Sequence, residues 1–259
     1  MPPLKIGLAL GSGAARGLSH IGVLAVLERE GIPIDMIAGT SIGAIIGVLY
    51  AQQKDTGWIK KLALDLSRKR FTFLADPSLS KTGIIRGRRI EKTLRATIGD
   101  TEFKDLRIPA ACVATDIDSG EEIVIKTGLV WEGIRSSASV PVIFTVAEWE
   151  GRYLVDGSLV NPVPVSIVRA MGADLVIAVN VIPHREIKTT TEPNIFTVLM
   201  QTINIPSQRI INSSLAGADV IIEPQVEHIG YANFHQAEEC IVQGEKATQD
   251  SIPEIRRHI

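Results

Sequence analysis

Cysteines are few in this sequence, and metal-binding spacings and long apolar runs are missing. The two cysteines, Cys112 and Cys240, are too few for a disulfide framework in 259 residues. Cys112 lies inside the apolar run at 110–114, so we expect it in the core, and a reducing compartment fits. Neither a CxxC nor an HExxH spacing occurs to indicate a metal site. We therefore expect no metal ion and no cofactor.

Charge and hydropathy argue against two further classes. The formal net charge is −2 at pH 7, which is not the basic balance of a nucleic-acid-binding protein. No apolar run reaches the roughly 18 residues of a transmembrane helix. Lys5 and the apolar run after it are similar to a short signal peptide, but cleavage near Ala15 would remove the first predicted strand, so we reject that interpretation. We expect a cytoplasmic protein that contacts membranes only peripherally.

The hydrophobic content of 45% is enough for the core of one large α/β domain, and we expect that domain to span residues 1–259. Strand-like and helical patterns alternate along the chain. Expected strands are 5–10, 36–39, 110–116, 121–125, 145–156 with a turn near Gly151, 174–180 and 219–223. Expected helices are 17–30, 41–53, 57–68, 87–98, 130–137, 163–171, 194–215 and 236–257. This alternation predicts a three-layer α/β/α fold with a mostly parallel or mixed central sheet, and the polar run 189–193 is expected to be a linker.

The most informative motif is G-T-S-I-G at 39–43. A largely apolar stretch at 34–38 leads into it, and helix-compatible spacing follows at 44–49. This order of strand, sharp turn and helix is typical of a nucleophile elbow. Ser41 would then stand at the N-terminus of a helix, whose dipole favours developing negative charge.

A glycine-rich loop, G-S-G-A-A-R-G at 11–17, joins the first expected strand to the first expected helix. Such a loop leaves backbone N–H groups free to bind an anion. One interpretation is a dinucleotide-binding loop and the other is an oxyanion hole serving Ser41. The dinucleotide interpretation needs an acidic residue at the end of the second strand. Asp35 precedes that strand, and this argues against it.

A third motif places Asp156 at the end of an expected strand, followed by a turn rich in Gly, Asn and Pro at 157–164. Strand ends of this kind often carry catalytic side chains. The alternative is that Asp156 only starts an Asx-turn. The presence of the other two motifs favours the catalytic interpretation.

Together these segments resemble the patatin-like phospholipase family, in particular its small bacterial members related to the neuropathy target esterase branch. The likeness covers most of the chain. Beyond the loop, the elbow and L-V-D-G at 154–157, it includes S-H-I-G-V-L at 19–24, R-S-S-A-S-V-P at 135–141 and G-A-D-L-V-I-A-V at 172–179.

The resemblance implies a patatin-like fold and hydrolysis of carboxylic esters, with lipids such as lysophospholipids or phospholipids as substrates. It implies a Ser–Asp dyad in which Ser41 is the nucleophile and Asp156 the base, working through an acyl-enzyme. Backbone N–H groups of Gly13 and Ala14 would form the oxyanion hole. The residues expected to support the loop and elbow are Gly11, Ser12, Arg16, Gly17, Gly39, Gly43 and Gly157.

The chain departs from the family's G-G-G-x-R-G loop at Ser12 and Ala14. Alanine still donates its N–H, but a positive φ at Ala14 would strain the hole. The departures keep open a non-catalytic lipid-binding or regulatory module with a degenerate site. The family's Asp-Gly-Gly or Asp-Gly-Ala also appears here as Asp156-Gly157-Ser158, a minor change between small residues.

A Ser-His-Asp triad is the rival mechanism, because His184, His228, His235 and His258 all follow Asp156 in the chain. None of them stands in a motif that would direct it to Ser41, and we expect His20 to be packed within the first helix. The elbow also ends only the second strand, whereas in α/β-hydrolases several strands precede it.

An amphipathic segment at 58–71 carries Lys60, Lys61, Arg68 and Lys69 on one face. Such a face can rest on an anionic lipid surface, although an ordinary solvated helix has the same pattern. A second basic segment, 81–95, is a candidate wall of an acyl pocket.

Overall fold

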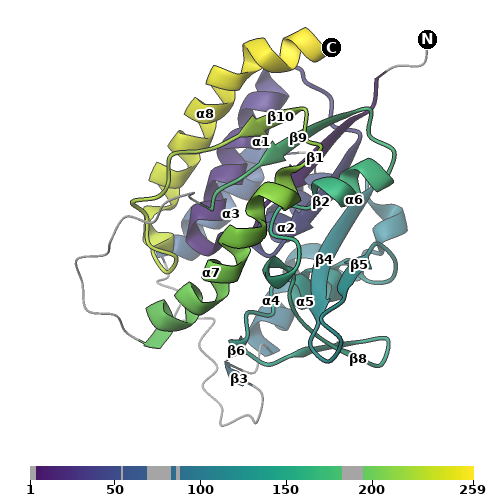
Figure 1. Cartoon of the computed structure of the whole chain (residues 1–259), viewed down its shortest axis with the longest axis vertical. Coiled ribbons are helices and arrows are strands. Elements are labelled where there is room, and N and C mark those ends of the chain that lie inside the picture. The colour runs from purple at the N-terminus through teal and green to yellow at the C-terminus, as the bar shows by residue number, and fades with distance from the viewer. Residues whose placement is uncertain (1–3, 54, 69–82, 86–87, 183–194) are drawn as a thin grey trace.

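The computed structural model has a central sheet with helices on both faces (Figure 1). The structure describes residues 4–53, 55–68, 83–85, 88–182 and 195–259. Within them the strand order is β10-β9-β1-β2-β4-β8-β7. β2 and then β8 pair along one edge of β4, and β5 pairs along its other edge. The strands are β1 (Ile6–Leu10), β2 (Met36–Thr40), β4 (Ala110–Asp116), β5 (Glu122–Ile125), β7 (Ala147–Trp149), β8 (Arg152–Asp156), β9 (Leu175–Val179) and β10 (Val220–Ile222).

The strands from β10 to β4 pair in parallel. A parallel sheet covered on both faces is built from apolar strands, and β1, β2, β4 and β9 are buried along their whole length. Successive side chains point to opposite faces. Leu8 and Leu10 accordingly join one core cluster, while Ala9 joins another.

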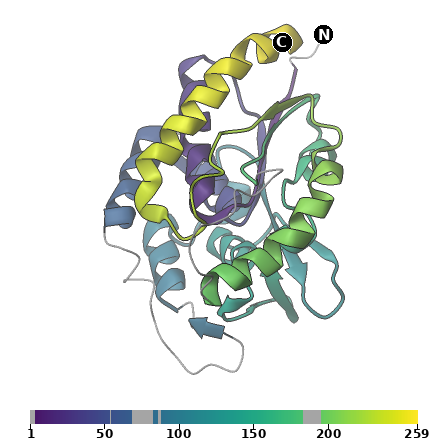
Figure 2. The same ribbon diagram turned by 60° about the vertical axis from the view of Figure 1, so that its left-hand side comes forward.

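Helices cover both faces of the sheet. One cluster contains residues of α1 (Ser19–Arg29), α2 (Ile42–Gln53) and α8 (Ala237–His258), and the other contains residues of α6 (Val165–Ala170) and α7 (Ile195–Leu215). Figure 2 shows the yellow α8 and the green α7 on opposite sides of the sheet. The three-layer α/β/α prediction is confirmed. Further helices are α3 (Thr56–Arg68), α4 (Arg88–Ile98) and α5 (Val130–Ser137).

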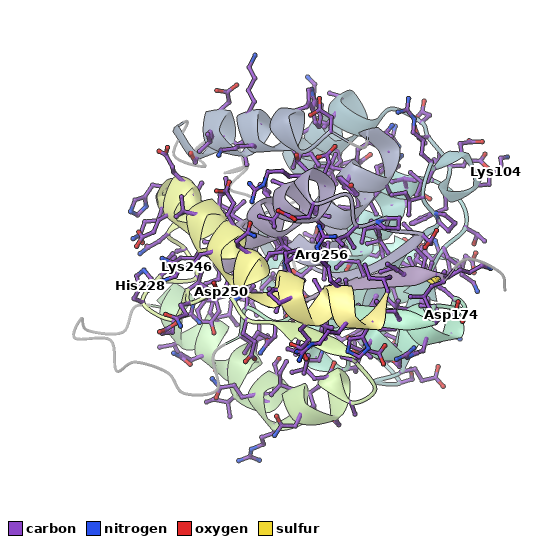
Figure 3. The ribbon with its side chains drawn as sticks, turned by 90° about the horizontal axis from the view of Figure 1, so that it is seen from above. Lys104, Asp174, His228, Lys246, Asp250 and Arg256 are labelled. Atoms are coloured by element: carbon purple, nitrogen blue, oxygen red, sulfur yellow. The ribbon has the colours of Figure 1, made fainter. Side chains whose placement is uncertain are left out.

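The last helix is held against the first at their ends. Arg256, labelled on α8 in Figure 3, donates to the Glu30 side chain at 3.0 Å and to the Glu30 carbonyl oxygen at 3.2 Å. Because Glu30 follows α1 directly, the two helices stay side by side over the β1 face.

The sheet is mixed because β8 pairs antiparallel with β4 and with β7. A two-residue turn joins β7 to β8, and both of its residues, Glu150 and Gly151, have positive φ values of 48° and 76°. Positive φ at both central positions is the geometry of a tight hairpin turn. The predicted turn near Gly151 is therefore confirmed.

The expected strands and helices lie where the sequence placed them, with small shifts at their ends. One difference is that residues Ala14–Leu18 form a 3-10 helix before α1, since Arg16 N–H donates to the Gly13 carbonyl oxygen. The other is a parallel pair that the sequence did not reveal, β3 (Gly83–Ile85) with β6 (Val142–Phe144). The predicted linker 189–193 lies outside the described residues. None of the helices in the described ranges is both long and apolar enough to span a bilayer.

Candidate active site

Ser41 lies in the turn between β2 and α2 with a φ of +57°. This left-handed conformation costs an L-residue roughly 1–2 kcal/mol. A Cβ added at Gly39 would lie 2.5 Å from the Ala44 nitrogen, and one at Gly43 would lie 2.2 Å from the Leu10 carbonyl oxygen. Only glycine fits at either position, so the turn needs both glycines of the G-x-S-x-G pattern.

The Ser41 hydroxyl donates a hydrogen bond of 2.6 Å to Asp156 Oδ2. The two residues are 115 positions apart in the chain. They meet because β2 and β8 both border β4. Asp156 ends β8, and only 2% of it is exposed.

The second carboxylate oxygen of Asp156 has a different partner. Oδ1 accepts the Ser158 N–H at 2.9 Å, which closes the turn after β8. A Cβ at Gly157 would lie 2.2 Å from the Val113 carbonyl oxygen, so this turn also requires glycine. One oxygen of Asp156 thus caps the turn, and the other accepts from Ser41.

Burial raises the pKa of Asp156 above its ordinary value, and the hydrogen bonds from Ser41 and Ser158 pull it partly back. A carboxylate whose pKa is raised toward neutral pH is a better proton acceptor than an exposed one.

The glycine-rich loop is fixed where it leaves β1. The Gly11 N–H donates to the Val179 carbonyl oxygen at 3.0 Å, and the Ser12 N–H donates to that of Pro162 at 2.8 Å. These bonds hold the loop against the end of β9 and against the segment that follows β8.

The next two N–H groups are those of Gly13 and Ala14, and neither has an acceptor within the described part of the chain. Bonding resumes at Ala15, whose N–H donates to the Tyr231 carbonyl oxygen at 3.2 Å. A Cβ at Gly13 would lie 2.4 Å from Val181 Cγ2, which leaves no room for a side chain. Two unpaired neighbouring donors on a fixed loop are suited to binding an oxyanion.

Ala14 has a φ of +49°. We expected strain in the oxyanion loop if the φ of Ala14 were positive, and it is positive. Glycine adopts this conformation without the steric cost that alanine bears. Gly17 joins the loop to the elbow, because a Cβ there would lie 2.1 Å from Ile42 Cγ2.

Arg16 points away from the loop toward the segment before η4 (Phe234–Gln236). Its Nε donates to the Ile229 carbonyl oxygen at 2.6 Å, and Nη2 donates to that of Glu227 at 3.0 Å. Its guanidinium also stacks over the Tyr231 ring at 4.0 Å. These contacts tie the loop to residues 227–231.

Two side chains that sequence reasoning left without a role hold the loop and the elbow. His20 is fully buried and bonds through Nε2 to the Gly11 carbonyl oxygen at 2.7 Å. Burial lowers its pKa to about 4, so it is neutral at ordinary pH and Nε2 carries the proton. Ser137, at the end of α5, accepts the Ser41 N–H at 2.9 Å. Both lie within motifs that carried the family resemblance.

The other histidines of the described residues have no hydrogen bond to Ser41. His228, at the edge of the molecule in Figure 3, bonds to Glu239 at 2.7 Å. His235 and His258 are exposed. His184 lies outside the described residues. Neither Ser41 nor Asp156 is bonded to a histidine in the described part of the structure.

A cavity of about 440 Å³ opens at Ser41 and Ala14. Its walls come from α1, α2, α3 and α4, together with β6, and are almost entirely apolar. Residues that represent these helices are Ile21, Ile45, Leu49, Leu62, Leu66 and Leu94. Leu94 belongs to segment 81–95, so the described end of that segment contributes to the wall of this cavity. An apolar cavity of this size fits a hydrocarbon chain.

The remaining alternatives for the loop find no support in the geometry. Asp35 accepts the Ile6 N–H at 2.7 Å, so it lies at the start of β2 and not at the end where a ribose would bind. Among the residues described here, no three His, Cys, Asp or Glu side chains form a group that could hold a metal ion.

The model of the patatin-like phospholipase family matches residues 8–169. The chain belongs to that family. The match includes the glycine-rich loop, the elbow and Asp156.

Relatives of this patatin-like protein include an uncharacterized NTE family protein of Mycobacterium tuberculosis, 36% identical over 179 residues. The alignment covers 68% of this chain and 49% of the relative. The lysophospholipase NTE1 of Saccharomyces cerevisiae is 37% identical over 180 residues, covering 68% of this chain and 11% of the yeast protein. The chain thus matches about half of the mycobacterial relative's length and a small part of the yeast protein.

The crystal structure of VipD from Legionella pneumophila has a similar fold, with a TM-score of 0.55 and 12% identity. The similarity covers 95% of this chain and 66% of VipD. At this identity it supports the patatin-like fold of the protein and carries no further conclusion.

The raised pKa of Asp156 predicts how stability depends on pH. Between the ordinary aspartate pKa and the raised pKa of folded Asp156, the unfolded chain has lost this proton while the folded protein still binds it. The free energy of unfolding therefore falls as pH rises through this interval. In Asp156→Asn, the amide can still accept from Ser158 and donate to Ser41. We expect this variant to have a higher Tm than wild type at pH 7, with the gap closing as pH falls toward the ordinary aspartate value.

Thermal unfolding between pH 4 and pH 8 measures this difference. Asp118→Asn, which changes an exposed aspartate, is the matched control and should follow wild type. A lower Tm for Asp156→Asn at pH 7 would contradict the prediction.

Proposed function

We propose that this patatin-like protein is a serine hydrolase of carboxylic esters, with lipids as substrates, and that residues 1–259 form one domain of this type. The observation that carries the proposal is the 2.6 Å hydrogen bond from Ser41 Oγ to buried Asp156 at an apolar cavity. A nucleophile bonded to its base beside a hydrocarbon-sized space is what attack on an acyl ester requires.

In the first half of the proposed reaction, Ser41 Oγ attacks the ester carbonyl carbon while its proton passes to Asp156 Oδ2. The carbonyl oxygen becomes an oxyanion, which accepts hydrogen bonds from the N–H groups of Gly13 and Ala14, with that of Ile42 at the start of α2 as a further donor. The intermediate collapses, the C–O bond to the alcohol breaks, and Asp156 returns the proton to the departing oxygen.

The second half hydrolyses the acyl-enzyme. Asp156 takes a proton from water as the water oxygen attacks the acyl carbon, and the bond to Ser41 Oγ then breaks. The proton returns to Ser41, and a carboxylic acid leaves. The cavity holds the acyl chain throughout, so a lysophospholipid, a phospholipid or another long-chain ester fits. The yeast relative is named a lysophospholipase, which favours the first.

The alternative of a non-catalytic lipid-binding or regulatory module rests on Ser12 and on the positive φ of Ala14. A vestigial site has no need of a strained elbow or of a buried carboxylate bonded to a serine, and both are present. We therefore favour the hydrolase.

A fluorophosphonate probe and a short-chain ester assay test the proposal directly. We expect wild type to label and to hydrolyse, and Ser41→Ala to do neither. Asp156→Asn should lower kcat/KM about a thousandfold or more, because the asparagine amide cannot take the proton from Ser41 and the nucleophile is left without its base. Replacement of His184, His228 or His235 should leave most of the activity.

The pH profile separates the dyad from a triad. Asp156 must be deprotonated to act, so kcat/KM should fall as pH drops below its raised pKa, and the histidine variants should not shift that fall. A single histidine substitution that silences the folded enzyme would establish a triad instead. A wild-type protein that is folded but neither labels nor hydrolyses would favour the non-catalytic module.

The oxyanion loop gives a second test. Gly13→Val should abolish turnover in a folded protein, because its side chain collides with Val181 and displaces the donors; losing one such donor costs on the order of 100- to 1000-fold in rate. Ala14→Gly should keep or modestly raise kcat, because glycine relieves the positive φ. Steady-state kinetics decide, and full activity in Gly13→Val would exclude this loop as the oxyanion hole.

We also propose weak peripheral binding to anionic membranes through the basic face of α3. Lys61 is exposed, whereas Lys60 lies 3.7 Å from Glu245. The Arg68 side chain and Lys69 lie outside the described residues. Replacing both Lys60 and Lys61 by Gln should weaken sedimentation with anionic vesicles, as added salt should. Hydrolysis of a short soluble ester is the control and should not change. Undiminished vesicle binding would exclude this face.

A further inference from the structure

The last residue of α5 and the segment just after it contact both members of the proposed dyad. Ser137 Oγ accepts the Ser41 N–H at 2.9 Å, and the Ser139 carbonyl oxygen accepts the Asp156 N–H at 3.0 Å. The two contacts are only two residues apart on one segment. They lie in the R-S-S-A-S-V-P motif at 135–141, to which the reaction proposed above gives no role.

The Ser137 hydroxyl makes one hydrogen bond as a donor and one as an acceptor. It donates its single hydrogen to the Val113 carbonyl oxygen at 2.6 Å, which leaves its lone pairs for the Ser41 N–H. Ser137 is fully buried, so water cannot take over either bond.

Val113 belongs to β4, the strand along which the ends of β2 and β8 meet. Val113 is in register with Thr40 on β2, and the next residue, Ala114, is in register with Asp156 on β8. Through Ser137, the backbone of Ser41 is therefore attached to the strand that also positions Asp156.

The rest of the segment is itself held in place. Arg135 donates to the Ser139 hydroxyl and, at 2.7 Å, to the Thr145 carbonyl oxygen. The segment whose Ser139 carbonyl oxygen accepts the Asp156 N–H is thus itself fixed to Thr145, which lies after α5.

We propose that Ser137 is a positioning residue of the Ser41–Asp156 pair: its hydroxyl holds the strained backbone of Ser41 so that Oγ stays within hydrogen-bonding distance of Oδ2. This inference rests on the proposed function. Without the acceptor, the buried Ser41 N–H has no partner, and relaxation of the positive φ would turn Oγ away from Asp156. Because Ser137 is not part of the cavity lining, substrate binding should be little affected.

The test compares wild type with Ser137→Ala and Ser137→Cys, since a thiol fills the space of the hydroxyl but is a weak acceptor. We expect kcat to fall about 10- to 100-fold in both, the range that follows from displacing a reacting group by about 1 Å. KM should stay near the wild-type value. Fluorophosphonate labelling should slow in parallel with kcat.

Ser136→Ala is the matched control. Ser136 is buried one position earlier on α5, and in the described residues its side chain has no hydrogen bond to Ser41 or Asp156. Substitution of a buried serine can lower stability at either position. We therefore measure Tm for each variant and normalise kcat to the amount of folded protein. Where Ser137→Ala does not fold, Ser137→Cys decides.

The inference is overturned if the Ser137 variants keep the wild-type kcat, if Ser136→Ala lowers kcat equally, or if KM rises while kcat stays constant. Failure of the proposed function looks different. In that case wild type itself neither labels at Ser41 nor hydrolyses esters, and the inference falls with it.

Discussion

The hydrogen bond between Ser41 and Asp156 depends on one feature of the sheet, which is that the ends of β2 and β8 meet along the same edge of β4. Because β4 borders both, a serine that follows a parallel strand and an aspartate that ends an antiparallel one reach each other at 2.6 Å. The reversal of direction at β8 is what brings the end of that strand to the elbow. Several other features of the structure serve the same contact. They include the glycines that allow the turn, the Ser158 cap on Oδ1 and the two bonds from the end of α5.

This contact is held against a local cost in free energy. Ser41 and Ala14 both have positive φ, and Asp156 is buried with a raised pKa. Strained backbones and buried carboxylates persist only where the surrounding structure determines them strongly. Here that determination comes from the apolar core on both faces of the sheet and from neutral donors and acceptors, such as His20 on Gly11 and Ser137 on Ser41.

The sequence predicted the features that local patterns determine. The apolar runs of β1 and β9, the tight turn after β7 and the glycines around Ser41 all follow from short-range sterics and burial. The fold class follows from their alternation. The contacts of Arg16 with Ile229 and of Ser41 with Ser137 join residues 213 and 96 positions apart, and no local pattern specifies such a pairing. For the same reason the pairing of β3 with β6 was missed, since it joins two segments that are far apart in the chain.

The amphipathic pattern of α3 had two explanations at the level of sequence, a membrane surface and an ordinary solvated helix. The structure adds a third factor, because the apolar side of α3 contributes Ile59, Leu62 and Leu66 to the cavity at Ser41. Lining the cavity accounts for the apolar side of the helix without a membrane. Membrane binding must therefore be judged on the basic side alone, where Lys60 is already close to Glu245 of α8 and Lys61 is exposed. A helix whose apolar side lines a cavity and whose polar side faces solvent needs no bilayer to explain its composition. The vesicle measurement therefore tests an additional property of α3 and not the reason for its pattern.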